Sequence, residues 1–225
     1  MTGQRGGRHS IGRGRDAPRG QGARGQGIVE FTLLVPLFLV LLLGMVELGF
    51  AFNHQLTLQY ATREGARIGA DLVNGGGTLG CGSEDSPNAS TVDPIIIEAV
   101  DRILTSTGSP IPLDQVSRIR IFKADSSGKD TLGLDNDWTY TAVPFTLSDG
   151  TQVNFRPGAT SWDACSRSNR AGNTYANAVD SIGVSISYTY RLTTPLAGAL
   201  RLISGSQAST ISMTDDTVMQ FNPTS

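Results

Sequence analysis

An apolar run near the N terminus constrains this chain more than any other feature. From Phe31 to Val46 no charged residue occurs, and beyond Glu47 the apolar character continues to Phe52. A helix that crosses the hydrocarbon core of a bilayer needs about 20 mostly apolar residues. We therefore predict a membrane-spanning helix over about residues 31–52, with one interior acid.

The helical pattern continues beyond this run. Between Asn53 and Val73 apolar residues recur at helical spacing, and no proline breaks the pattern. Pro36 lies inside the apolar run, where membrane helices tolerate it. We predict one long helix over 26–73, ended by a glycine run. Small residues on this helix permit the close approach of a neighbouring helix, and the glycines expected to serve this packing are Gly44, Gly49, Gly65 and Gly69.

Charge is strongly segregated along the chain. Residues 1–25 contain six arginines and one acid, whereas the rest of the chain has 12 basic and 19 acidic residues. A basic tail can bind nucleic acid, but this one adjoins an apolar helix, and cytoplasmic arginines set the orientation of such helices. We favour a single-pass protein of the cell membrane with a cytoplasmic N terminus and an extracytoplasmic head, and no nucleic acid partner. No small-residue cleavage site follows the run, so a retained anchor is favoured over a secretory signal.

Residues 74–225 read as an α+β head. A loop is expected over 74–92, followed by a short helix with Asp93 as N-cap and Pro94 as its first residue. Alternating β-branched and aromatic residues then predict an antiparallel sheet. The strands are expected at 116–124, 137–147, 151–155, 180–192 and 208–221, with a candidate break at Asp215-Asp216.

No catalytic or cofactor-binding motif occurs, and we expect neither enzymatic activity nor a cofactor or metal. The two histidines, His9 and His54, are too far apart to form a pair. The acidic stretch 125–137 raises a calcium hypothesis, but its ligand order is not that of an EF-hand loop, and a solvated hairpin connection is favoured. Cys81 and Cys165 are candidates for one disulfide in an oxidising compartment.

The N-terminal third resembles a known signal. A basic leader, Gly25, four residues, then Glu30 and a hydrophobic helix are similar to a type IV prepilin signal. In more detail, "GQGIVEFTLLVPLFLVLLLGMVELG" followed by "QYATREGARIGA" resembles the TadE-like proteins of the Tad/Flp tight-adherence pilus systems, over about residues 23–70. The family's tail often ends in an Arg-Glu-like pair, and this chain has Asp215-Asp216 at about that place.

The resemblance implies a pilin-like fold and a structural role. It implies a leader over 1–25, cut by a prepilin peptidase between Gly25 and Gln26, and a minor pilin or pseudopilin that helps to assemble a pilus for adhesion and surface colonisation. It also implies that Glu30 pairs with the N-terminal amine of a neighbouring subunit. The implied partners are other pilin or pseudopilin subunits and the Tad inner-membrane assembly proteins.

Three alternatives stay open at this point. Glu30 could simply flank the span at the membrane interface. Glu47 either faces a partner helix or marks the outer interface. The protein as a whole could be an uncleaved single-pass membrane protein whose β-rich head binds an extracellular ligand or a cell-wall polymer.

Overall fold

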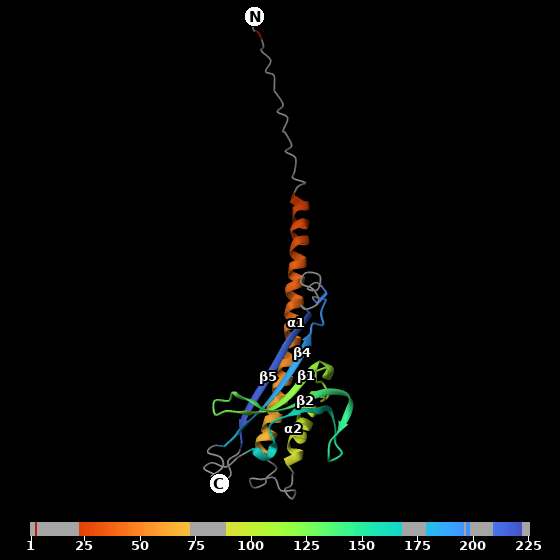
Figure 1. Ribbon diagram of the computed structural model, residues 1–225. Helices are drawn as coiled ribbons and strands as arrows, with labels where there is room; N and C mark the ends of the chain where they lie inside the picture. The colour runs from red at the N-terminus through yellow and green to blue at the C-terminus, as the bar shows by residue number, and fades with distance from the viewer. Residues whose placement is uncertain are drawn as a thin grey trace. The chain divides into compact units, whose positions relative to one another are not determined.

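The fold is that of a computed structural model (Figure 1). It describes residues 3, 23–72, 89–167, 179–195, 197–198 and 209–221. The chain divides into two compact units, residues 1–42 and 43–225. Each unit is described by itself below.

The first helix, α1, runs without interruption over Ala23–Leu72 and includes Pro36. The predicted single helix over 26–73 is therefore confirmed. In the first unit, the apolar side chains of α1 are exposed, among them Phe31, Leu34 and Phe38. Exposed apolar side chains on every side of a helix are what a lipid environment accepts and water does not.

The second unit is built on a five-stranded antiparallel sheet (Figure 1). The strands are β1 (Val116–Ala124), β2 (Asp130–Thr146), β3 (Gln152–Thr160), β4 (Ser181–Arg191) and β5 (Thr210–Gln220), in the order β3-β2-β1-β4-β5. Two short 3₁₀ turns lie outside the strands: η1 (Leu113–Gln115) directly precedes β1, and η2 (Ala164–Ser166) follows β3. The α+β class and the antiparallel sheet agree with the prediction.

One face of the sheet packs on helices. Ile119 and Ile121 on β1 are fully buried, and they share a core with Leu58 of α1 and Ile96 of α2 (Ala89–Leu104). Over residues 119–121 of β1, the buried isoleucines alternate with the partly exposed Arg120, which follows the period of two of a half-buried strand. The second unit is thus two layers, a sheet on one side and α2 with the C-terminal part of α1 on the other.

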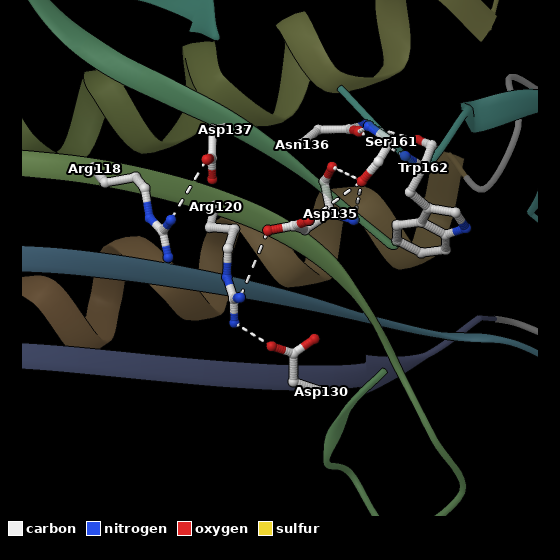
Figure 2. Close-up of polar contacts among 8 residues, drawn as sticks. All are labelled: Arg118, Arg120, Asp130, Asp135, Asn136, Asp137, Ser161 and Trp162. Carbon is white, nitrogen blue, oxygen red and sulfur yellow. Dashed lines mark hydrogen bonds and ion pairs between the residues drawn. The ribbon is translucent and has the colours of Figure 1, made fainter. Parts of the chain in front are cut away.

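The opposite face of the sheet carries ion pairs between the neighbouring strands β1 and β2 (Figure 2). Arg120 on β1 binds Asp130 at 2.6 Å and lies 3.6 Å from Asp135, both on β2. Arg118 binds Asp137 at 3.4 Å. Three acids of the stretch 125–137 thus form ion pairs with arginines of the neighbouring strand. The prediction of a hairpin connection over this whole stretch was wrong, because β2 begins at Asp130 and only the turn before it is a connection.

Two further boundaries differ from the prediction. α2 begins at Ala89, so Asp93 is inside the helix and does not cap it. Its carboxylate instead binds Arg167 at 2.7 Å and accepts a hydrogen bond from Asn136 Nδ2 at 2.6 Å. β5 is continuous through Asp215-Asp216, because one of the two side chains turns to α1 and the other to the opposite face. The glycine run expected to end α1 lies outside the described residues.

Candidate functional site

Glu47, the acid inside the apolar run, is buried within the second unit. Its side chain accepts hydrogen bonds from the Tyr190 hydroxyl, from the Thr193 backbone N–H at 3.0 Å and from the Thr194 backbone N–H at 3.0 Å. Only 4% of the residue is exposed. Glu47 does not face a partner helix, because its side chain faces the end of β4 in the same chain. These contacts leave a place at the outer membrane interface open.

Tyr190 is held as a hydrogen-bond donor to this carboxylate. Burial, followed by the hydrogen bond to Glu47, raises the pKa of Tyr190 to about 12. The phenol therefore keeps its proton at neutral pH. A buried carboxylate that meets three donors is stable where an unpaired one would be costly.

A second polar contact lies two turns further along α1. His54 Nδ1 lies 2.8 Å from the Tyr188 hydroxyl, which donates to Gln115 Oε1 at 3.0 Å. A hydroxyl has one hydrogen, so Nδ1 of His54 carries the hydrogen that it donates to Tyr188. The His54 ring also meets the edge of the Tyr190 ring, with 4.9 Å between centroids. Burial raises the pKa of Tyr188 above its ordinary value.

A third contact joins α1 to β5. Asp215 accepts hydrogen bonds from Thr62 Oγ1 at 2.5 Å and from Gln55 Nε2 at 3.2 Å. Thr62 also lies 3.0 Å from the Thr217 hydroxyl. We call these three contacts together the polar seam; its members are Glu47, His54, Gln55, Thr62, Gln115, Tyr188, Tyr190, Thr193, Thr194, Asp215 and Thr217.

Beyond the polar seam, glycines bring α1 close to the head. A Cβ at Gly65 would lie 2.8 Å from Val100 of α2, and one at Gly69 would lie 2.7 Å from Ile182 of β4. These two glycines were expected to pack against other subunits, and this expectation needs correction, because the chain's own α2 and β4 occupy their surface. A Cβ at Gly44 or Gly49 would meet nothing within 4 Å, so their packing role stays a prediction.

The face of α1 that points away from the sheet carries an apolar stripe. Its residues follow helical spacing and have exposed fractions of 51–76%; they are Met45, Leu48, Phe52, Leu56 and Tyr60. We call this set the uncovered stripe. Contiguous exposed apolar surface of this kind is typical of a face that contacts lipid or another protein rather than water.

The predicted processing segment lies in the first unit. Gly25, Gln26 and Glu30 are all exposed on α1, and a Cβ at Gly25 would meet nothing within 4 Å. Gln26 Nε2 donates a hydrogen bond to Glu30 Oε1 at 2.9 Å, one helical turn along. The basic leader before Ala23 lies outside the described residues, apart from Gly3.

The predicted disulfide and the question of a metal site concern the head. Cys165 in η2 is disulfide-bonded, and Cys81, the only other cysteine of the sequence, lies outside the described residues. In the described part of the chain, no group of three or more His, Cys, Asp or Glu residues could hold a metal ion.

An open cavity of about 730 Å³ is lined by residues of α2, β2, β3 and η2. Both tryptophans of the chain, Trp138 and Trp162, line it. However, the Trp162 ring stacks against Phe221 and carries the Arg167 guanidinium 4.4 Å from its centroid. The ring is therefore engaged within the chain, and the cavity shows no evident ligand chemistry.

The sequence predicted a processing segment, which stays a prediction, and it did not predict the polar seam. The seam partners of Glu47, His54 and Thr62 lie 134 to 155 positions away in the chain, and no local pattern connects them. A weak signal existed in Tyr188 and Tyr190, which alternate on the buried face of the strand 180–192. Two tyrosines on a buried face need polar partners.

Comparison with known proteins gives a match for α1 alone. In the described part of the chain one helix, over Gly25–Leu72, is long and apolar enough to span a membrane. Residues 25–67 match the family model described as TadE-like protein. No curated protein and no solved structure matches the chain. The family match begins at Gly25, includes Glu30 and Glu47, and ends before α2. Residues 25–67 of this protein are therefore a TadE-like segment on a membrane-spanning helix.

Proposed function

We propose that the protein is a minor pilin or pseudopilin that is anchored in the cell membrane and takes part in building a Tad/Flp-type pilus. The observation that carries this proposal is the TadE-like match, which starts at Gly25 and covers the apolar part of α1. Its role is structural, in adhesion and surface colonisation, without enzymatic activity or a cofactor. Its N terminus is cytoplasmic and its head extracytoplasmic.

In this proposal a prepilin peptidase cuts the chain between Gly25 and Gln26. Both residues are exposed on α1, and glycine leaves the peptide bond sterically accessible. The cut removes the basic leader and creates an N-terminal amine on Gln26. Glu30 is then the fifth residue, and its carboxylate pairs with the amine of a neighbouring subunit. A charge inside a membrane is costly alone and is usually functional and paired.

The uncovered stripe supports assembly through helix packing. Its apolar side chains lie on the face of α1 that the head leaves free. Gly44 and Gly49 are open in the same region, where a partner helix could approach closely. We propose that other pilin or pseudopilin helices contact this face, whereas Gly65 and Gly69 serve the fold of the head.

Substitution of Glu30 tests the assembly role. Glu30→Ala should insert into the membrane at the wild-type level and yield no pili, because the partner of the N-terminal amine is lost. Asp71→Ala, which removes an exposed acid from the end of the same helix, is the matched control and should leave piliation unchanged. The measurement is pilus number per cell by electron microscopy, with immunoblots of the membrane fraction. Normal pili in Glu30→Ala cells would remove the pairing role.

A further inference from the structure

The hydrogen bond between Gln26 and Glu30 points to a second role for Glu30, within its own subunit. Gln26 Nε2 donates to Glu30 Oε1 at 2.9 Å, and both residues are exposed on α1. The inference rests on the proposed cut after Gly25, which makes Gln26 the first residue of the mature chain.

An N-terminal glutamine is open to a cyclisation that no internal glutamine undergoes. Its neutral α-amine attacks the side-chain Cδ, the Nα–Cδ bond forms, and the Cδ–Nε2 bond breaks. The amide nitrogen leaves as ammonia and takes one proton from the amine. The product is a five-membered lactam, and its nitrogen carries no positive charge. Cyclisation would therefore abolish the cation on which subunit pairing through Glu30 depends.

We infer that Glu30 protects the mature N terminus from cyclisation by holding the Gln26 side chain along the helix. In an α-helix the N–H of residue 30 bonds to the carbonyl of residue 26. This backbone bond does not involve the leader, so Gln26 stays on the first turn after the cut. Residues four apart face each other on a helix, and the side-chain hydrogen bond is retained. It directs Cδ toward Glu30 and away from the α-amine.

The charge of Glu30 acts in the same direction. A carboxylate beside an amine favours the protonated form of that amine. An ammonium group has no free electron pair and cannot attack Cδ. Glu30 thus lowers the fraction of reactive amine and removes the reactive carbon from its reach.

Cyclisation of the full mature chain in detergent tests the inference. Chains whose leader is replaced by the recognition sequence of a specific protease, which cuts directly before Gln26, supply the same N terminus for every variant. Mass spectrometry of the N-terminal peptide follows the loss of one ammonia with time. Glu30→Leu, which lacks both acceptor and charge, should cyclise about tenfold faster than wild type. Glu30→Gln keeps an acceptor without the charge, and its rate should lie between the two.

Equal cyclisation rates in wild type, Glu30→Gln and Glu30→Leu would overturn the inference. A wild-type chain that is largely cyclised when isolated from cells would overturn it as well. A native N terminus at a residue other than Gln26 would instead contradict the proposed cut, and the engineered leader separates these two outcomes.

Discussion

Glu47 interrupts the apolar run of α1, and its carboxylate is buried against the end of β4. The two backbone N–H groups and one hydroxyl that reach it come from Tyr190, Thr193 and Thr194. Hydrogen bonds to a charged group contribute about 1.5–3 kcal/mol, more than bonds between neutral groups. At the residue scale, this acid attaches α1 to the C-terminal end of β4.

Glu47→Gln should therefore destabilise the head. The amide retains one acceptor but turns an N–H toward donors, and we expect a loss of about 1.5–3 kcal/mol in the free energy of unfolding. Denaturant unfolding of the full chain in detergent, followed by tryptophan fluorescence, measures it, since Trp138 and Trp162 are both in the head. Tyr190→Phe, which removes one donor and keeps the ring, should show a smaller loss. Unchanged stability in Glu47→Gln would contradict this role.

Gly65 and Gly49 form a matched pair on the same helix. A Cβ at Gly65 meets Val100 and Val184, so Gly65→Ala should cost about 1–3 kcal/mol of overpacking. A Cβ at Gly49 meets nothing within 4 Å, and Gly49→Ala should preserve stability or raise it by about 1 kcal/mol through helix propensity. The same unfolding measurement compares them. Equal effects would mean that α1 does not pack closely on α2 and β4.

The buried carboxyl of Asp101 predicts a pH dependence of the head's stability. Burial raises the pKa of this carboxyl, while hydrogen bonds from Asn154 act in the opposite direction. An acid whose pKa is higher in the folded state binds its proton more tightly there, so stability falls as pH rises from the unfolded pKa through the folded one. Asp101→Asn should remove this part of the pH dependence. An unchanged pH profile of the unfolding midpoint in Asp101→Asn would contradict the burial.

At the element scale, the polar seam revises the membrane boundary on α1. A helix has a rise of 1.5 Å per residue, and about 20 residues cross a hydrocarbon core of about 30 Å. Because Glu47 is bound by head residues, a span that ends before it, over about 27–46, fits the contacts better than the predicted 31–52. This revised span predicts that the helix leaves the bilayer just before Glu47.

Cysteine labelling tests this boundary. A cysteine at Leu39 should be protected from a membrane-impermeant maleimide, whereas one at Asn53 should react when the reagent is added outside the cell. The reason is that Leu39 lies in the middle of the revised span and Asn53 lies beyond Glu47. Labelling at Asn53 only after the membrane is opened would reverse the proposed orientation. A cysteine at Phe50, which is exposed on α1, distinguishes the two spans: it should react from outside if the span ends at residue 46, and its protection would restore the longer span.

Some elements follow from local pattern and others do not. β1 was predicted with its observed bounds, because Ile119 and Ile121 alternate with arginines. The start of β2 was not, since three aspartates in a strand make sense only once Arg118 and Arg120 lie opposite them. The start of α2 was predicted too late in the chain, because Asp93-Pro94 has the local sequence of a helix start. The buried Arg167 that binds Asp93 is distant in sequence.

The candidate site divides in the same way. Gly25 and Glu30 were proposed from the sequence, because their spacing and the adjoining apolar run are local, and their roles stay predictions. The polar seam was not predicted, because its contacts join residues 73 to 160 positions apart in the chain. Asp215 illustrates the difference: it reads as a strand breaker, yet its partners Gln55 and Thr62 hold it on the inner side of an edge strand.

At the scale of the whole molecule, the protein combines a TadE-like segment with a two-layer head. The first unit contains an apolar helix on which the residues of the proposed cut are exposed. In the second unit the head covers one face of α1 and leaves the uncovered stripe free. A filament subunit needs both an anchor that is processed and a helix face that is available to partners. The central claim is that the leader is removed at Gly25.

The mass of the chain recovered from membranes tests that claim most directly. Intact mass and the N-terminal peptide should show a protein that begins at Gln26 and lacks residues 1–25. A chain that retains the leader would contradict the claim, and it would favour the uncleaved single-pass protein with a ligand-binding head.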